Sequence, residues 1–516
     1  MAFVLKVAGG SARVADDEVW IRPRFRPDTR SPRDVEIRWW IALALFLAIA
    51  LIDRAPLFGN PVIQVDEQFY LLAGDRLLHG DWPFVAIWDR KPIGLFLLYA
   101  GLRGLGGNGI LAYQVAATLS VAATALVIER MARRIAPAPG ALLAGALYIL
   151  CLPMVGGIGG QAPVFYNLPV AVAAWIILRL VEGEHGDRAL TLRGAGAMLL
   201  VGVAIQIKYT VMFEGAFFGI VLVLLSLRER ADIAATAARA ALWASIAFLP
   251  TMIAFAGYVL AGHGQDFLFA NFWSIFLRSD DPADQTAGRF WTIVAMTAPL
   301  VAAGAVAPFI VEAARYRLPL AFALAWAVVA CLGVVAFGSY FDHYALPLFV
   351  PLCLAAAPAL GHGKAGQRAG VALIAASLVV GTIVVRRNIT NRGSEATVAP
   401  IVAMIGERPR GCVYVFDGDP IIYHLTQSCL LTRWPFPPHL ANHRESAALG
   451  VDAVAETRRI MAQRPAWVVT TRGPDSGLTN RTDAAIVDSA LAADYQAVLS
   501  IPVGKRQRML YRLRAS

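Results

Sequence analysis

Residues Val65–Tyr99 read VDEQFYLLAGDRLLHGDWPFVAIWDRKPIGLFLLY, and this stretch decides how the rest of the chain is interpreted. It brings two adjacent carboxylates, a second cluster of Asp, Arg and Lys, and several aromatic residues into one segment. Long apolar runs lie on both sides of it. Charged side chains beside a membrane are costly unless they lie at the water interface or belong to a functional site. The sequence therefore predicts a polar loop at a membrane surface, with the apolar runs as its scaffold.

The composition is that of a polytopic membrane protein. The chain has 516 residues, of which 58% are hydrophobic and only 16% are charged, whereas soluble domains carry about 25% charged residues. The net charge of +10 comes from arginines that are scattered between apolar runs and form no single patch. Such scattered arginines are typical of residues that set membrane topology. The pattern excludes nucleic acid as a partner and predicts that membrane lipids surround the chain.

About eleven transmembrane helices are predicted, because a spanning helix needs about 20 mostly apolar residues. Ile93–Leu105 is left out because it is brief and contains Arg103. If this segment lies along the surface, the arginine-bearing connections fall on the side of the N-terminus, as the positive-inside rule requires; only Arg386 and Arg387 break the rule. The predicted spans are Trp39–Ile52, Ile110–Val127, Ala141–Ile158, Val164–Leu180, Ala195–Ile207, Val211–Leu227, Ala241–Leu260, Trp291–Val311, Leu318–Phe337, Tyr344–Leu360 and Val371–Val385.

The predicted organisation has three parts. Residues 1–38 are polar and rich in Arg and Pro, and are interpreted as a cytoplasmic N-terminal arm. Residues 39–388 form an all-α membrane domain with two long outer loops, 56–108 and 262–290. Residues 389–516 have a different composition, in which apolar strand-like runs alternate with helical patterns. They are predicted to form a small C-terminal α/β domain outside the cytoplasm.

The tail is assigned strands and helices from its local patterns. Cys412 and Cys429 could pair if the tail lies in an oxidising compartment, or could remain free thiols, and the sequence leaves both open. The predicted strands are Gly411–Phe416, Cys429–Thr432, Ala466–Thr471 and Ala497–Val503, and the predicted helices are Pro420–Leu425, Ser446–Gln463 and Asp483–Asp494.

The adjacent carboxylates Asp66 and Glu67 have two interpretations. A carboxylate can act as a general base, and two adjacent carboxylates can hold a divalent cation that offsets phosphate charge. Alternatively, Asp66 caps a helix that runs through Phe69–Leu78, and Glu67 lies just inside that helix. The functional interpretation is favoured because Asp89-Arg90-Lys91 lies on the same outer loop.

Two lysines are candidates for binding an anion. Lys208 lies between the apolar runs Gly202–Ile207 and Tyr209–Phe213, where a lysine is rare and usually has a partner or ligand. The predicted topology places it on the same side as Lys91, and phosphate is a natural ligand for such point charges. The alternative is a lysine that extends its ammonium group to the lipid headgroups.

Two further outer segments carry candidate groups. His343 and Tyr344, in the run Gly338–Tyr344, are either ligand contacts or part of an aromatic belt at the membrane interface. The segment Gly156–Gln161 is glycine-rich, but it follows no strand and is followed by no Lys-Ser/Thr pair, so it is not a P-loop. Its glycines are expected to let the backbone approach a ligand or another helix.

Taken together, these residues resemble the GT-C glycosyltransferases, in the group of the lipid A aminoarabinose transferase and the protein O-mannosyltransferases. The resemblance covers about the first 360 residues in layout. The motifs that carry it are Asp66-Glu67-x-x-Tyr70, Asp89-x-Lys91-Pro92, Gln161-Ala162 with Asn167-Leu168-Pro169, Lys208, and His343-Tyr344-x-Leu346-Pro347.

The resemblance implies an inverting transferase in the bacterial inner membrane, with a cytoplasmic N-terminus and a periplasmic C-terminal domain. It implies a polyprenyl-phosphate sugar donor and a lipid or cell-envelope glycan acceptor. Asp66 would be the catalytic base, with Glu67 in support. A divalent cation is left open, with these two carboxylates as its only candidate ligands. The residues expected to bind substrate are Asp89, Lys91, Gln161, Lys208, His343 and Tyr344.

Three positions depart from the pattern of the relatives. No acidic residue follows Gln161, Phe69 stands where an Arg often follows the carboxylate pair, and Gln114 stands where another Arg is found. These departures keep an inactive accessory protein of the same fold as an alternative. A transporter of lipid-linked sugars is a second alternative, but it should carry charges or broken helices near mid-membrane. The charges here concentrate at one face, which favours the enzyme.

Overall fold

The computed structural model describes residues 38–515, except 230–231, 280, 312 and 475–476. Everything below concerns Ile37–Ser516, which forms one compact unit. The predicted N-terminal arm, residues 1–38, lies outside the described residues apart from Arg38.

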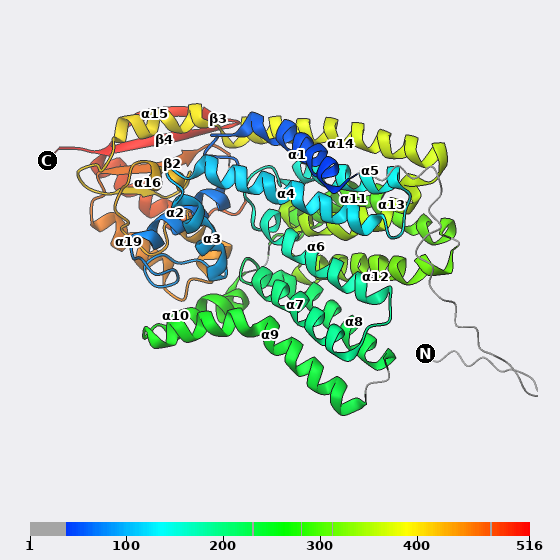
Figure 1. The fold of residues 1–516 in the computed structure, drawn as a ribbon. Helices are drawn as coiled ribbons and strands as arrows, with labels where there is room; N and C mark the ends of the chain where they lie inside the picture. Colours follow the sequence, from blue (N-terminus) through cyan, green and yellow to red (C-terminus); the bar gives the residue numbers. More distant parts are fainter. Residues whose placement is uncertain (1–37, 230–231, 280, 312, 475–476, 516) are drawn as a thin grey trace, which may run out of the picture. The chain divides into compact units, whose positions relative to one another are not determined.

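Eleven segments of the described chain are long and apolar enough to cross a membrane, which confirms the predicted number. The helices that form them run along one another over most of the molecule (Figure 1). They are α1 (Trp39–Arg54) with η1 (Ala55–Leu57), α4 (Ile110–Ala132), α5 (Ala138–Cys151) with η2 (Leu152–Val155), α6 (Ala162–Val181), α7 (Asp187–Ile205), η3 (Tyr209–Val211) with α8 (Met212–Arg228), α9 (Ile233–Leu260), α11 (Ala283–Ile310), α12 (Ala314–Phe337), η6 (Asp342–Leu348) with α13 (Phe349–Gly361), and α14 (Gly363–Arg392) with α15 (Glu395–Ile405).

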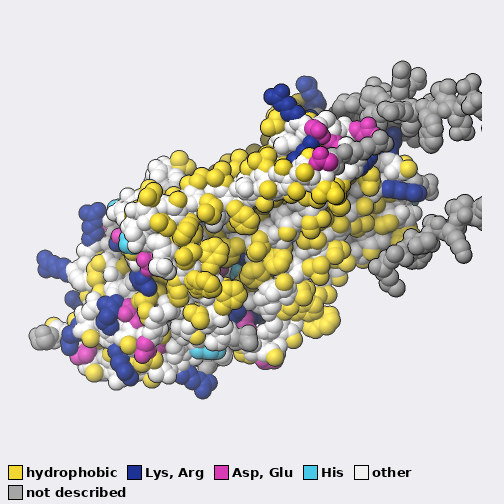
Figure 2. All heavy atoms as spheres, turned by 90° about the horizontal axis from the view of Figure 1, so that it is seen from below, with side chains coloured by type: hydrophobic (Ala, Val, Ile, Leu, Met, Phe, Trp, Pro, Cys, Tyr) yellow, Lys and Arg dark blue, Asp and Glu magenta, His cyan; other side chains and the backbone are white. Residues whose placement is uncertain are grey.

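The surfaces of these helices fit a lipid environment. Large apolar side chains point outward from them, as Leu260 and Phe309 do at 89% and 85% exposure. Figure 2 shows hydrophobic side chains covering the middle of one face, with charged groups gathered towards its ends. Inside the bundle, small residues let the helices approach closely. A Cβ at Gly140 of α5 would overlap the carbonyl oxygen of Ala357 in α13, a close packing typical of membrane helices.

The predicted outer loop 56–108 contains two helices, α2 (Val65–Leu78) and α3 (Ile93–Arg103). At about 1.5 Å per residue, α3 is too short to cross a bilayer, in agreement with its exclusion from the predicted spans. Its first turn is fixed to the end of α7, because the Leu95 N–H donates to the Gln206 carbonyl at 3.0 Å. The loop 262–290 contains the short helical segments α10 (Gly264–Leu268), η4 (Phe269–Trp273) and η5 (Ser274–Leu277).

The C-terminal part confirms the predicted small domain of helices and a few strands. Its sheet has the strand order β1-β2-β4-β3, in which β1 and β2 are parallel and the other pairs are antiparallel. The strands are β1 (Val413–Val415), β2 (Trp467–Arg472), β3 (Tyr495–Val503) and β4 (Arg506–Leu513), and the helices are α16 (Ile421–Leu425), α17 (Pro438–Ala441), α18 (His443–Ser446), α19 (Ala453–Ala462) and α20 (Arg481–Asp494).

Several local predictions in this part are wrong. Cys429–Thr432 is irregular chain, fixed by a disulfide between Cys429 and Cys412, whose Cα atoms are 5.2 Å apart. The strand Arg506–Leu513 was not predicted, because arginines interrupt its apolar pattern. The helix predicted at Ser446–Gln463 begins only at Ala453, since Asp452 caps it by accepting hydrogen bonds from the N–H groups of Val454 and Ala455.

The C-terminal part packs directly on α2 and on the loop that follows it (Figure 1). The Gln68 side chain donates to Asp419 at 3.3 Å, and the Trp88 N–H donates to the Arg433 carbonyl at 2.7 Å. The ring of Phe69 lies 5.0 Å from that of Phe436. These contacts fix the segment that carries the predicted site between the helical bundle and the C-terminal sheet.

Candidate active site

Asp66 lies in the first turn of α2, one residue after the helix begins at Val65. Gln64, not Asp66, is the capping residue, so the alternative in which Asp66 caps the helix is wrong. Instead the Asp66 Oδ2 atom accepts a hydrogen bond of 2.9 Å from the Gln161 side chain. Burial alone would raise the pKa of Asp66, but the neighbouring Lys91, the His343 ring, this hydrogen bond and Lys208 hold it below its ordinary value. The carboxylate is therefore ionised at neutral pH.

Lys91 reaches the same place from the segment before α3. Its Nζ atom lies 3.6 Å from Oδ2 of Asp89 and 5.8 Å from the ring centroid of Tyr70. Burial would lower the pKa of Lys91, but Asp89 and Asp66 raise it above its ordinary value. Asp89 also accepts from the Arg90 N–H at 2.6 Å. Asp89 therefore acts as a neighbour that keeps Lys91 charged and in place.

Lys208 approaches from the break between α7 and α8. Its Nζ atom lies 4.4 Å from the centroid of the Tyr344 ring, which is a cation–π contact. The ring of His343 lies 4.9 Å from the same tyrosine ring. Burial first, and Lys91 second, lower the pKa of Lys208 to about 7. The two lysines are close enough to repel each other, so a bound anion would stabilise the charged form of both.

Arg278 is a further cation at this site that the sequence did not single out. It lies at the end of η5 and forms an ion pair with Glu445. Burial would lower the pKa of Arg278, but Glu445 and the hydroxyl of Tyr344 raise it. Its position in the predicted outer loop 262–290 is the only signal in the sequence. Tyr344 is therefore surrounded by cations from three separate segments, namely Lys91, Lys208 and Arg278.

The glycine-rich segment presents Gln161 to Asp66. Arg54, fully buried at the end of α1, donates hydrogen bonds to the carbonyls of Gly157 at 2.6 Å and Gly159 at 2.5 Å. Tyr99 of α3 donates to the Gly160 carbonyl at 2.6 Å. In the sequence Arg54 only interrupts an apolar run. A charged residue in such a run usually has specific partners, and here these partners are the carbonyls of the glycine-rich turn.

Glu67 faces away from Lys91, Lys208 and Arg278, and towards Arg54. Its carboxyl group lies against Gly159, where a Cβ atom would overlap both carboxyl oxygens. Burial raises the pKa of Glu67 to about 8, although the Gly160 N–H and Arg54 act to lower it, so the group is protonated at neutral pH. Asp66 and Glu67 thus have different neighbours. Among the described residues, no group of three or more His, Cys, Asp or Glu side chains could hold a metal ion.

The C-terminal part contributes buried charged groups that contact the residues next to Lys91. Glu445 of α18 pairs with both Arg90 and Arg278. Burial would raise the pKa of Glu445, but Arg90 and Arg278 lower it to about 2. His439 of α17 lies 3.9 Å from Oδ1 of Asp89. The residues that orient two of the site's cations therefore come from a part of the chain more than 150 residues away in sequence.

The structure thus gathers six of the predicted residues, namely Asp66, Lys91, Gln161, Lys208, His343 and Tyr344. Glu67 and Asp89 lie behind them. An ionised carboxylate facing several cations can accept a proton from a hydroxyl group while an anionic group binds beside it.

Comparisons with known proteins show which proteins this chain resembles. No family model matches the chain. The chain is 28% identical, over 178 residues, to an undecaprenyl phosphate-alpha-4-amino-4-deoxy-L-arabinose arabinosyl transferase of Edwardsiella ictaluri (strain 93-146). It is 26% identical, over 179 residues, to transferase 1 of the same description in Pseudomonas fluorescens (strain Pf0-1). These alignments cover 33% and 34% of this chain, and each spans only 31% of its relative.

A solved structure matches over a much larger share of the chain. It is the crystal structure of ArnT from Cupriavidus metallidurans bound to undecaprenyl phosphate. The match has a TM-score of 0.61 at 18% sequence identity and covers 91% of this chain and 97% of the other. The likeness includes the C-terminal part as well as the bundle. The chain therefore has the fold of that ArnT structure, and the predicted polytopic all-α membrane fold with a small C-terminal domain is confirmed.

Proposed function

We propose that this protein is a membrane glycosyltransferase that moves a sugar from a polyprenyl-phosphate donor to a lipid or cell-envelope glycan acceptor. The observation that carries the proposal is the ionised Asp66 facing Lys91 and Lys208 across one buried site. The names of the two relatives include an undecaprenyl-phosphate sugar, and the matching structure contains undecaprenyl phosphate. These names make 4-amino-4-deoxy-L-arabinose the first donor sugar to test.

The mechanism assigns one role to each group. Asp66 takes the proton of the acceptor hydroxyl, and the oxygen attacks the anomeric carbon of the donor sugar. The bond from that carbon to the phosphate oxygen breaks, and polyprenyl phosphate leaves with the electron pair. Lys91, Lys208 and Arg278 stabilise the charge on the leaving phosphate. A single displacement of this kind inverts the configuration at the anomeric carbon.

We further propose that the N-terminus is cytoplasmic and that the site and the C-terminal part are periplasmic, in the bacterial inner membrane. The arginine-bearing connections on one side of the bundle support this orientation, and the disulfide between Cys412 and Cys429 suits an oxidising compartment. A membrane-impermeant maleimide added to intact spheroplasts should label Ala396→Cys and not Glu184→Cys, both at exposed positions. The reverse pattern would overturn the orientation.

The transferase activity is tested in a strain that lacks the gene. Mass spectrometry of its envelope lipids and glycans should reveal the loss of one sugar residue, and the wild-type protein should restore it. Asp66→Asn should insert in the membrane at a normal level and restore nothing, because an amide cannot accept the proton. Asp81→Asn, at an aspartate of the same loop that pairs with Arg76, is the matched control and should restore the sugar. An unchanged envelope in the deletion strain, or full activity of Asp66→Asn, would contradict the proposal and favour an accessory or transport role.

A further inference from the structure

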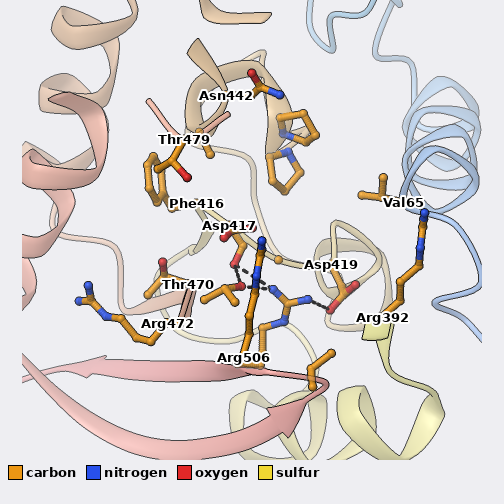
Figure 3. A pocket seen from close by; sticks show the side chains of 18 of the residues that line it. Val65, Arg392, Phe416, Asp417, Asp419, Asn442, Thr470, Arg472, Thr479 and Arg506 are labelled. Carbon is orange, nitrogen blue, oxygen red and sulfur yellow. Dashed lines mark hydrogen bonds and ion pairs between the residues drawn. The ribbon is translucent and has the colours of Figure 1, made fainter. Parts of the chain in front are cut away.

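A cavity of about 550 Å³ lies where the C-terminal sheet faces the start of α2 (Figure 3). The ends of the parallel strands β1 and β2 form one wall of it, and Arg392 at the end of α14 lies at another side. Ligands commonly bind in the crevice outside the carboxyl ends of parallel strands. Asp66, Lys91 and Lys208 do not line this cavity, so it is separate from the candidate active site.

Arginines are the main charged groups of this cavity. Two of them have carboxylate partners at 2.7 Å, since Arg508 pairs with Asp419 and Arg472 pairs with Asp488. The guanidinium of Arg506 makes no hydrogen bond or ion pair with any residue that the structure describes, although it is half-buried and close enough to Asp417 to act on its pKa. Its side chain extends across the middle of the cavity (Figure 3). A partly desolvated guanidinium without a partner is stabilised by an anion, and phosphate and carboxylate fit its planar fork best.

The other charged groups of the cavity do not neutralise or repel a bound anion strongly. Burial chiefly raises the pKa of Asp417, although Arg508 and Arg506 act to lower it. Asp417 therefore loses its negative charge more readily than an ordinary aspartate, and it repels an anion less. Arg392 donates a hydrogen bond to the side-chain oxygen of Gln64 and has no carboxylate partner among the described residues.

Neutral groups complete the walls. Asn442 and Thr479 are polar residues of the lining, and the ring of Phe416 lines it as well (Figure 3). The side-chain oxygen of Asn442 caps α18 by accepting from the Arg444 N–H, which leaves its amide nitrogen to donate. Amide and hydroxyl groups beside an aromatic ring suit the hydroxyl groups and the apolar face of a sugar. A lining of this kind distinguishes the cavity from a site for a bare inorganic anion, which needs only the positive groups.

We propose that this cavity binds a saccharide that carries a phosphate or carboxylate group, and that this saccharide is the anionic part of the acceptor. The second clause rests on the proposed transferase function. The first turn of α2 links the two sites, since Val65 and Gln68 line the cavity while Asp66, between them in sequence, turns to Gln161. An acceptor anchored by Arg506 is thereby held at the helix end that carries the proposed base, while the donor phosphate has its own cations.

The test is a binding measurement that needs no turnover. The full chain in lipid nanodiscs is titrated with glucose 1-phosphate, inorganic phosphate and glucose by isothermal calorimetry. Glucose 1-phosphate should bind at least about tenfold more tightly than either of the others, and Arg506→Gln should weaken its binding about tenfold or more. Lys505→Gln removes the same charge from the neighbouring exposed residue, outside the cavity, and should change affinity less than about twofold.

Each other outcome overturns a stated part of the proposal. Equal affinity for inorganic phosphate would make the cavity an anion site with no saccharide selectivity, and equal affinity for glucose would exclude recognition of the charge. An Arg506→Gln variant that binds like wild type would exclude the cavity as the binding place. In the transfer assay, Arg506→Gln should raise the KM for the acceptor and leave the KM for the donor unchanged, and a rise in the donor KM would overturn the acceptor role.

Failure of this proposal and failure of the proposed function have different signatures. Asp66→Asn, inactive in transfer, should bind glucose 1-phosphate as the wild type does. Binding by a wild-type protein that transfers no sugar would contradict the proposed function and the acceptor role, and would support the saccharide site alone. Transfer by a wild-type protein that does not bind the sugar phosphate would contradict only the cavity site.

Discussion

Gln161 donates a hydrogen bond of 2.9 Å from its side-chain nitrogen to Oδ2 of Asp66, although the two residues are 95 positions apart in sequence. The bond exists because Arg54 and Tyr99 hold the carbonyls of the glycine-rich segment that leads into Gln161. The proposed base is therefore oriented by three elements, α1, α3 and the turn before α6, and none of these residues is itself a charge partner in the reaction.

Gln161→Ala should slow transfer and move its pH dependence. Hydrogen bonds to charged groups contribute about 1.5–3 kcal/mol, so kcat/KM at pH 6 should fall about tenfold. The hydrogen bond from Gln161 lowers the pKa of Asp66, so loss of this bond raises that pKa. The acid limb of the pH–rate profile should therefore move to higher pH. The measurement is a pH–rate profile from pH 3 to 9, which covers the acid limb. Gln463→Ala, at an exposed position, is the control; a profile of Gln161→Ala that coincides with the wild type would contradict the positioning role.

Lys208 should make donor binding depend on pH. Its pKa is lowered to about 7, whereas the phosphodiester of the donor keeps one negative charge throughout the neutral range. Donor affinity should therefore fall about tenfold, or 1.4 kcal/mol, between pH 6 and 9 as the ammonium loses its proton. Lys208→Arg should bind the donor with little pH dependence, because a guanidinium stays charged. Donor titrations at several pH values test this, with Lys505→Ala as the control. The same pH slope in Lys208→Ala as in the wild type would assign the dependence to another group.

The sequence predicts the membrane part better than the C-terminal part for a physical reason. An apolar run of about 20 residues identifies a membrane span by length and composition alone. All eleven candidate spans could therefore be predicted from the sequence. The strand Arg506–Leu513 mixes three arginines with apolar residues, and one of these arginines, Arg508, is buried, so no regular alternation of exposed polar and buried apolar residues marks it. Its pairing with β2 and β3 depends on long-range contacts. A pattern of that kind gives little local signal, since strand preference depends strongly on context.

The candidate site shows the same contrast. Asp66, Lys91 and Lys208 were found because charges beside apolar runs are conspicuous in any membrane protein. Arg54, Arg278 and Glu445 were missed because their importance comes from burial and from partners far away in sequence. Glu445 lies in an ordinary polar stretch, and only the packing of α18 against the outer loops makes it part of the site.

Gly159→Ala should destabilise the protein and reduce its activity together. An added Cβ would overlap the carboxyl group of the buried Glu67, and overpacking of this kind costs about 1–3 kcal/mol. The φ angle of Gly159 is not positive, so the effect arises from lack of space and not from backbone strain. Thermal unfolding in detergent and the transfer assay measure both effects. Gly101→Ala in α3, where a Cβ meets nothing within 4 Å, should leave both unchanged, and equal behaviour of the two variants would refute the close-packing explanation.

Glu445→Gln should weaken both the fold and donor binding, because it leaves Arg90 and Arg278 without their shared carboxylate. Breaking a buried ion pair by removing one partner costs about 3–5 kcal/mol. Since Arg278 also contacts Tyr344, the KM for the donor should rise more than the KM for the acceptor. The control is Glu407→Gln, at an exposed glutamate of the C-terminal part.

The pH dependence of stability separates this ion-pair role from a packing effect. The pKa of Glu445 in the folded protein is about 2, below the ordinary value of about 4.3 for an unfolded chain. Its stabilisation is therefore fully present above about pH 5 and is lost as the pH falls towards 2. The wild type should lose melting temperature between pH 6 and 3 more steeply than Glu445→Gln, which has no proton to gain there. If the two curves run parallel, Glu445 contributes volume and not charge, and the C-terminal part does not control the site through Arg278.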